Sequence, residues 1–167
     1  NPQVLYLVAL SYKYAGRPEE ALATVHRAQK IEPSANLHIL EGDLFFDKDR
    51  LQEAEKAYRR AIAASSESPE PYLQLAHIYR TQGQVDSALK VLDEVPSALQ
   101  QKYPIIQNSL GSIYYAEGRA KDAIDAYQKA LAFDPKYALV HYNLATVLRS
   151  LGRLNEAEQA YKNAIES

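Results

Sequence analysis

Residues 119–130, which read RAKDAIDAYQKA, decide the fold, because similar stretches occur four more times in the chain. The other copies are RPEEALATVHRA at 17–28, RLQEAEKAYRRA at 50–61, QVDSALKVLDEV at 84–95 and RLNEAEQAYKNA at 153–164. The first alanine of each copy falls at position 21, 54, 88, 123 or 157, so the period is 33 to 35 residues. A period of this length is typical of repeat proteins in which each unit is one supersecondary motif. Five such units fill all 167 residues.

Each unit is predicted to form two helices joined by a tight turn. Apolar residues recur at spacings of three and four, as an amphipathic helix requires; Leu110 and Ile113 show this in a first helix, and Ala123 and Tyr127 in a second. Between the two helices of each unit stands a residue that tolerates the left-handed backbone with which helices end. These turn residues are Gly16, Asp49, Gly83, Gly118 and Gly152.

Small residues recur at one position of every helix, where they let two helix backbones approach closely. Larger side chains such as Tyr79 and Tyr114 are then expected to fill the adjoining space. A single helix pair cannot cover its own apolar face, so several pairs must stack to form a continuous core. The small residues are Ala9, Gly42, Ala76, Gly111 and Ala145 on the first helices, and Ala21, Ala54, Ala88, Ala123 and Ala157 on the second.

This pattern resembles the tetratricopeptide repeat (TPR) family over essentially the whole chain. The resemblance is carried by the period, by Leu75-Ala76-x-x-Tyr79 and Leu110-Gly111-x-x-Tyr114 in first helices, and by the run from Gly118 through Ala123, Tyr127 and Ala130 to Pro135. It implies an all-α fold, a right-handed superhelical solenoid of stacked antiparallel helix pairs. The expected organisation is a single array over 1–167 with approximate repeats 2–34, 35–68, 69–103, 104–137 and 138–167. The pentatricopeptide family, which reads RNA, fits less well because the basic excess is missing.

Two positions depart from the repeat. Glu41 stands where the other units carry valine or leucine, and a buried unpaired carboxylate is costly, so we expect it to be partly exposed or paired. Pro96 falls where the third unit's second helix should continue. Because proline breaks a helix interior, we expect that helix to stop by Val95 and residues 96–103 to form an irregular connection before Pro104 starts the next pair.

Composition narrows the function classes. The chain has 19 Lys and Arg against 21 Asp and Glu, a net charge of −2, which argues against nucleic-acid binding by bulk charge. No apolar run approaches the roughly 20 residues that a membrane-spanning helix needs, so no membrane insertion is expected. The sequence has no Met and begins Asn1-Pro2, and we expect it to be an internal piece of a longer protein. A soluble protein is expected, with the cytoplasm slightly favoured and the periplasm left open.

No catalytic constellation is visible. The chain has no Cys, and its four histidines show none of the spacings of a zinc site. Phosphate-binding loops, dinucleotide fingerprints and nucleophile elbows are absent from the sequence. We therefore expect no enzyme activity, no cofactor and no metal.

In a TPR stack the first helices line the concave side, and the resemblance implies that this side binds a peptide or helix of a partner protein. Tyrosine and arginine, which most often anchor interfaces, recur at the concave positions. An alternative is that several of these tyrosines pack against neighbouring repeats. The candidate binding residues are Tyr6, Leu10, Lys13, Tyr14, Ile39, Asp43, Phe46, Leu73, His77, Arg80, Asn108, Ser112, Tyr115, Tyr142, Thr146 and Arg149.

Some family partners are not expected. Chaperone-binding TPR domains hold a C-terminal carboxylate with Lys, Asn and Arg from three successive first helices, and no frame of this chain supplies those cations. The partner is therefore expected to be a protein or peptide other than a chaperone tail. Two other functions stay open: a substrate-recruiting arm of a larger enzyme, and a structural protein that self-assembles. A homo-oligomer through the repeat ends is compatible with the second.

Overall fold

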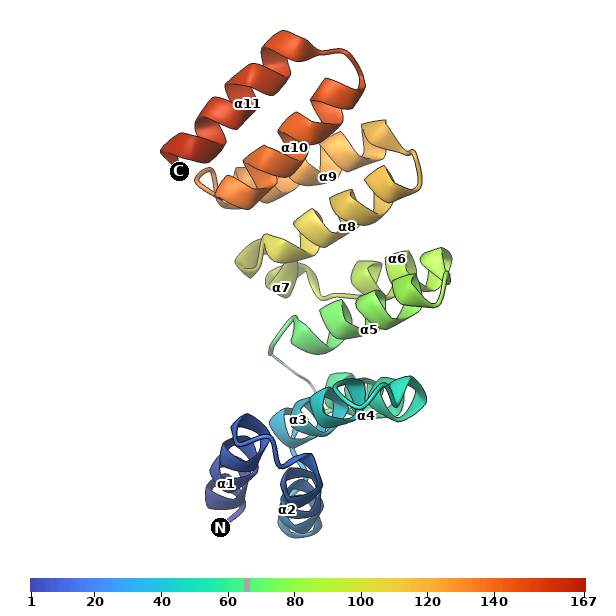
Figure 1. Ribbon diagram of the computed structural model, residues 1–167, viewed down its shortest axis with the longest axis vertical. Helices are drawn as coiled ribbons and strands as arrows, with labels where there is room; N and C mark the ends of the chain where they lie inside the picture. The colour runs from blue at the N-terminus through green and yellow to red at the C-terminus, as the bar shows by residue number, and fades with distance from the viewer. Residues whose placement is uncertain (65–66) are drawn as a thin grey trace. The chain divides into compact units, whose positions relative to one another are not determined.

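The computed structural model of the chain describes residues 1–64 and 67–167; residues 65–66, which belong to the expected repeat 35–68, lie outside the described residues. The described residues are helical with no strand, and none of their helices is long and apolar enough to cross a membrane. The helices (Figure 1) are α1 (Pro2–Tyr14), α2 (Pro18–Ile31), α3 (Ala35–Phe46), α4 (Leu51–Ala63), α5 (Glu70–Thr81), α6 (Val85–Asp93), α7 (Ser97–Lys102), α8 (Ile105–Ala116), α9 (Ala120–Phe133), α10 (Ala138–Ser150) and α11 (Leu154–Glu166).

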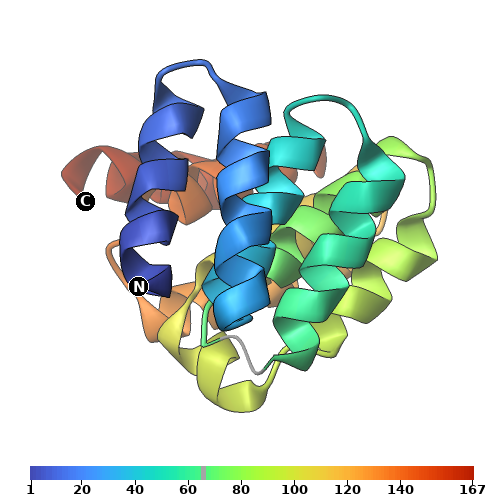
Figure 2. The same ribbon diagram turned by 90° about the horizontal axis from the view of Figure 1, so that it is seen from below.

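The chain divides into two compact units, Asn1–Ile78 and Tyr79–Ser167, which we call unit 1 and unit 2. In unit 1, α1 packs against α2, α2 against α3 and α3 against α4, and α1 also touches α3. In unit 2, α8 packs against α9, α9 against α10 and α10 against α11, and α8 touches α10. Figure 2 shows the first pair, α1 and α2, running side by side with a short loop between them. The fold class is thus all-α, built from antiparallel helix pairs.

First helices of one unit lie beside one another: α1 touches α3 and α8 touches α10, and the ring of Phe46 on α3 lies 5.5 Å from that of His77 on α5. Each unit therefore has a surface made of its first helices. We call it the first-helix face: α1, α3 and the unit 1 part of α5 in unit 1, and α8 and α10 in unit 2.

The predicted turn residues take the left-handed conformation. The backbone φ of Gly118 is +73°, and the three other turn glycines have φ between +69° and +74°. Asp49 has φ +58°, and it is the only residue other than glycine with positive φ among the described residues. In each case the chain reverses directly after the first helix, as shown by the amide of Arg119 donating to the carbonyl of Tyr114 over 2.8 Å.

An arginine follows each of four turns and fastens it. The guanidinium of Arg119 lies 4.4 Å from the centre of the Tyr114 ring and donates to Asp122, three residues onward, over 2.7 Å. Arg17 makes the same two contacts, with Tyr12 and Glu20. These arginines are the first residues of the repeated stretches. Their role is structural, because each one joins the end of the first helix to the start of the second.

Close packing of the small residues is confirmed in both units. A Cβ added to Gly42 would lie only 2.5 to 2.8 Å from ring atoms of Tyr58, and one added to Gly111 would lie 2.6 to 2.9 Å from the ring of Tyr127. Both tyrosine rings are almost completely buried. Glycine therefore allows a tyrosine of the second helix to lie flat on the backbone of the first.

The segment after α6 differs from its prediction. Helix α6 stops at Asp93, as the proline signal predicts, but residues 97–102 form the short helix α7 rather than an irregular connection. Pro96 is the N-cap of α7, and its carbonyl accepts from the amides of Leu99 and Gln100. Proline's fixed φ favours a helix start, so the residue that ends one helix begins another.

Candidate functional site

On the first-helix face of unit 1, charged side chains of α1 and α3 meet. Nζ of Lys13 lies 2.9 Å from Oδ2 of Asp43 and 3.8 Å from Oδ2 of Asp47. The second oxygen of Asp43 accepts a hydrogen bond from the hydroxyl of Tyr58 over 2.8 Å. Asp43 is therefore engaged from both sides, while Asp47 is mostly exposed.

The charges of Asp43 and Lys13 also act on two neighbouring groups, the Tyr6 hydroxyl and the Glu70 carboxyl. Burial raises the pKa of the Tyr6 hydroxyl, and the negative charges of Glu70 and Asp43 raise it further. Burial also raises the pKa of the Glu70 carboxyl, followed by the charge of Asp43, while Lys13 opposes the shift. In both groups burial is the largest cause of the raised pKa, and the neighbouring carboxylates add to it.

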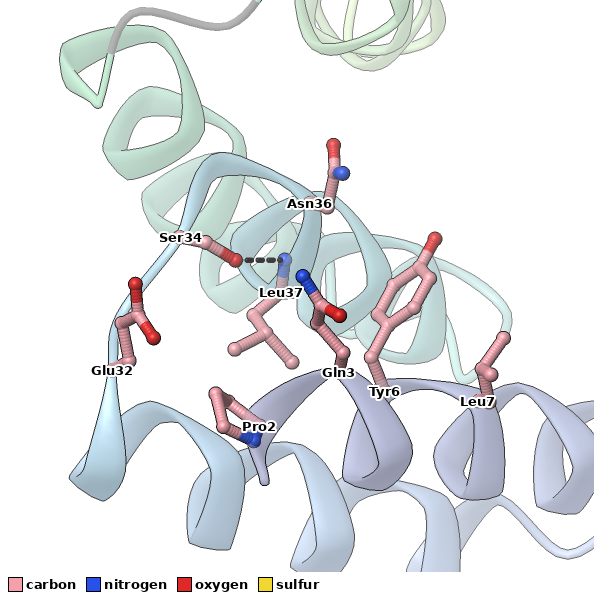
Figure 3. Close-up of a pocket in the computed structure, with 8 residues that line it drawn as sticks. All are labelled: Pro2, Gln3, Tyr6, Leu7, Glu32, Ser34, Asn36 and Leu37. Atoms are coloured by element: carbon pink, nitrogen blue, oxygen red, sulfur yellow. Dashed lines mark hydrogen bonds between the residues drawn. The ribbon is translucent and has the colours of Figure 1, made fainter.

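A pocket of about 350 Å³ lies at the N-terminal turns of α1 and α3. Figure 3 shows Gln3, Tyr6 and Asn36 directed to the same side, with Leu37 extending from α3 toward Pro2. Ser34 is the N-cap of α3, accepting weakly from the amide of Leu37 over 3.4 Å. The pocket is lined by Pro2, Gln3, Tyr6, Leu7, Glu32, Ser34, Asn36 and Leu37.

The remaining candidates of unit 1 differ in exposure. The rings of Phe46 and His77 lie 5.5 Å apart, tilted by 57°, and both are half-buried. Tyr14 is 83% exposed. Leu10 and Leu73 are half-buried, whereas Ile39 belongs to the buried core.

In unit 2, polar candidates form bonds between neighbouring helices. Asn108 is buried, and its side-chain oxygen accepts from Nδ2 of Asn143 over 2.8 Å, which joins α8 to α10. Oγ of Ser112 lies 3.2 Å from the hydroxyl of Tyr127, and Oγ1 of Thr146 lies 3.3 Å from that of Tyr161.

The aromatic candidates of unit 2 occupy two environments. Tyr115 is half-buried and packs against the core cluster. Tyr142 is 55% exposed, and its ring meets that of Tyr161 edge-on at 5.7 Å. Arg80 and Arg149 are exposed. Tyr142 and Tyr161 also line a mainly apolar pocket of about 480 Å³ with Ala138, Leu139, Ala164 and Ile165.

One relation between the candidate residues is seen only in the structure. Three polar first-helix candidates each share a hydrogen bond with the tyrosine 15 residues later, on the second helix. In the sequence, this relation corresponds to a polar residue and a tyrosine at a constant spacing of 15 residues. The pairs are Asp43 with Tyr58, Ser112 with Tyr127 and Thr146 with Tyr161.

Glu41 lies away from this face and is paired, as expected. Its side chain is buried, with 3% of the residue exposed, and accepts from Nε2 of Gln29 over 3.0 Å and Nη1 of Arg60 over 3.3 Å. Ring nitrogens of His26 and His38 lie 3.2 and 3.5 Å from its oxygens. Three helices, α2, α3 and α4, thus share one buried carboxylate.

Within the described ranges, no group of three or more His, Cys, Asp or Glu side chains is arranged to hold a metal ion.

Comparison with known proteins identifies the repeats. Family models described as "Tetratricopeptide repeat" match residues 6–69, 45–113 and 138–167, and one described as "TPR repeat" matches 111–148. Cellulose synthase operon protein C of Pseudomonas fluorescens is 28% identical over 129 residues, which cover 72% of this chain and 10% of that protein. Small glutamine-rich tetratricopeptide repeat-containing protein 2 of Mycosarcoma maydis is 31% identical over 80 residues, 48% of this chain and 22% of that protein. The chain thus spans only a small part of either relative.

Solved structures share the fold. PilF of Pseudomonas aeruginosa matches with a TM-score of 0.84 at 20% identity, covering 99% of this chain and 75% of that one. MamA matches with a TM-score of 0.77 at 20% identity, covering 95% and 93%. YrrB, described as a TPR protein with an unusual peptide-binding site, matches with a TM-score of 0.69 at 20% identity, covering 97% and 84%. By its repeats, its helix pairs and these matches, the chain belongs to the tetratricopeptide repeat family, whose repeats serve as protein–protein interaction modules.

Proposed function

We propose that the first-helix faces bind a peptide or helix of a partner protein and that the chain carries out no catalysis itself. The observation that supports this most is the exposure of large aromatic side chains on these faces, above all Tyr14 and Tyr142. A helix face that only meets water is charged and polar. Exposed tyrosines supply large contact area with little conformational freedom to lose, which is why they anchor interfaces.

Side chains on one face of α10 support partner binding by unit 2. Tyr142, Thr146 and Arg149 follow one another at spacings of four and three, so they share one face of the helix. Tyr142 provides an apolar ring beside the 480 Å³ pocket, and Arg149 provides a fork of donors for a carboxylate. An apolar residue followed by an acidic one would match this arrangement. The name of YrrB reports peptide binding for a protein of the same fold, which agrees with such a role.

The test uses peptides selected from a random phage-displayed library on the wild-type chain. In a triple variant carrying Tyr115→Ala, Tyr142→Ala and Arg149→Ala, the affinity for peptides that contact unit 2, measured by fluorescence polarisation, should fall by about tenfold or more. The control is Phe133→Ala, which removes an exposed aromatic of α9 and should leave affinity unchanged. Circular dichroism must show an intact helical fold in both. Unchanged binding of every selected peptide by the folded triple variant would contradict partner binding at the first-helix face of unit 2.

A second candidate function is a recruiting arm of a larger protein. It is favoured by the match to cellulose synthase operon protein C, since the matched region makes up 10% of that relative. An immunoblot of the source cells with antibodies against this chain measures the native polypeptide. A band far above 18.7 kDa supports the arm, and a band at that mass excludes it.

Self-assembly is a third candidate, favoured by apolar residues exposed on the outermost helices. Val4 and Leu7 are exposed on α1, and Leu154 and Ile165 on α11. Inside a repeat array such faces are covered by neighbouring repeats. Light scattering over a wide concentration range checks the idea, because end-to-end association must raise the mean mass with concentration, whereas a constant monomer mass excludes it.

A further inference from the structure

We infer that the first-helix face of unit 1 selects a basic partner segment, one with a Lys or Arg beside an apolar residue, its cation lying near Asp43, Glu70 and Tyr6. This selectivity rests on the proposed function, since it names the chemistry of the partner that one of the two faces accepts. It is carried by the charges on this face, by the pocket that continues it and by the aromatic rings between them.

Carboxylates outnumber cations on this face. Among the described residues of unit 1, Lys13 is the cation beside Asp43, Asp47 and Glu70; its Nζ contacts both aspartates, and its charge acts on Glu70. Among the described residues the carboxylate of Glu70 takes part in no ion pair. One Lys cannot neutralise three carboxylates, so the face keeps an excess of negative charge. A cation brought by a partner would gain a charge-assisted hydrogen bond there.

The pocket at the start of α1 and α3 also favours a positively charged side chain of the partner. Its lining contains one carboxylate, Glu32, and no Lys or Arg. Gln3 and Asn36 add polar groups that can accept hydrogen bonds, while Pro2 and Leu7 are apolar. Its volume of about 350 Å³ falls within the range of ligand pockets. A long basic side chain, apolar along its stem and charged at its tip, matches this lining.

Aromatic rings connect the pocket with the carboxylates. Tyr6 lines the pocket, and burial followed by the charges of Glu70 and Asp43 raises the pKa of its hydroxyl. Farther along α3, Phe46 packs against His77 and leaves part of its ring exposed. Rings of this kind attract a cation by their faces and pack an apolar neighbour by their edges.

An acidic segment is the occupant that this face disfavours. It would meet the uncompensated carboxylates, and like charges brought together at an interface oppose binding. The exposed charge on a candidate position of α10 in unit 2 has the opposite sign and comes from Arg149. The two units therefore differ in the charge they accept.

The experiment isolates unit 1 by selecting random phage-displayed peptides on the full chain that carries Tyr115→Ala, Tyr142→Ala and Arg149→Ala. Peptides that bind this chain should contain Lys and Arg in clear excess over the starting library. Adding Glu70→Gln and Asp47→Asn should lower their affinity about tenfold, the loss expected for one charge-assisted hydrogen bond. The control adds Asp125→Asn, an exposed carboxylate of α9, and should leave affinity unchanged. Circular dichroism and urea unfolding establish that each variant is folded.

The outcomes separate this inference from the proposed function. If wild type selects peptides but the triple variant selects none, or selects peptides without a basic excess, the basic preference is overturned while partner binding by unit 2 stands. Selected peptides that bind equally well after Glu70→Gln and Asp47→Asn also overturn it. If the wild type selects no peptide at all, the proposed function fails, and the basic preference fails with it. The basic preference is supported if the selected peptides are rich in Lys and Arg, lose affinity after Glu70→Gln and Asp47→Asn, and bind more weakly at high salt.

Discussion

The hydroxyl of Tyr58 donates to Oδ1 of Asp43 over 2.8 Å while its ring lies flat against Gly42, so one side chain of α4 is held at both ends by adjacent residues of α3. The contact explains a size relation between positions 16 residues apart. Where the first helix carries glycine, the second carries a fully buried tyrosine, as at Gly111 and Tyr127. Where it carries alanine, the opposite position holds a smaller residue such as Val25, or a tyrosine that stays partly exposed.

Replacing Gly42 by alanine should therefore destabilise unit 1. The new Cβ would lie 2.5 Å from a ring atom of Tyr58, far inside contact distance, and the buried ring is fixed by its hydroxyl. Overpacking of this kind costs about 1–3 kcal/mol. Urea unfolding followed by circular dichroism measures the loss. The double variant with Tyr58→Leu is the control, because it should lose less than the two single variants together; strict additivity would contradict the clash.

The sequence predicts this packing only in part. Recurring alanine and glycine, together with the period, establish which helix faces meet. They do not reveal that glycine admits a tyrosine whose hydroxyl reaches a polar residue of the first helix, since that bond depends on the crossing geometry. The short helix α7 is not predicted for a different reason: proline ends a helix, but it is also compatible with a helix start, and Pro96 is the N-cap of α7.

Replacing Asp49 by glycine should stabilise unit 1. Asp49 has φ +58°, a conformation that costs a side-chain-bearing residue about 1 kcal/mol or more, and the four equivalent turns carry glycine. Part of the gain is offset by the greater freedom of glycine in the unfolded chain, which leaves an increase of up to about 1 kcal/mol. Differential scanning calorimetry detects it as a raised Tm. Gly118→Ala is the matched control and should lower Tm, and a lower Tm for Asp49→Gly would show that its side chain stabilises the turn.

Replacing Glu41 by leucine should leave stability unchanged or raise it. Leucine stands at the equivalent position of the last three units, and removing a buried ion pair in favour of an apolar side chain is often neutral or favourable. The partners Arg60 and His26 are about half exposed, so water can solvate them when the carboxylate is gone. Glu41→Ala, which leaves a hole, should be less stable than Glu41→Leu by about 2–5 kcal/mol. Urea unfolding of both variants measures the difference in stability. A large loss of stability for Glu41→Leu would show that the hydrogen bonds and ion pairs of Glu41 stabilise the fold.

The candidate site was predictable as a set of helix positions but not as a charge pattern. Register along the first helices identifies which side chains share a face, and it includes Ile39 and Asn108, which the structure buries. Whether such a residue turns to the core depends on the neighbouring repeat, which a single-helix pattern does not contain. The excess of carboxylate around Tyr6 arises because α3 with its C-cap Asp47 contributes two carboxylates and α5 one, whereas α1 contributes the cation Lys13, and only the fold brings these charges together.

Glu70 should make the protein less stable as pH rises from mildly acidic to neutral. Burial and the charge of Asp43 raise its pKa above the ordinary 4.5, so between 4.5 and the raised value the folded chain binds more protons than the unfolded one. The free energy of unfolding then falls as pH increases through that window. Glu70→Gln removes the titration, so its stability relative to wild type should increase as pH rises from 4.5 through the raised pKa and then stay level.

Glu156→Gln provides a control of opposite sign for this pH dependence. The hydrogen bond from Arg153, 2.6 Å long, holds the pKa of the Glu156 carboxyl below 4.5. Its contribution is therefore present above 4.5 and is lost as pH falls through the lowered value, so Glu156→Gln should be less stable than wild type near neutrality and equal to it in acid. Urea unfolding of both variants at several pH values and constant ionic strength compares them. A stability difference for Glu70→Gln that does not change with pH would show that burial and Asp43 do not perturb this carboxyl in solution.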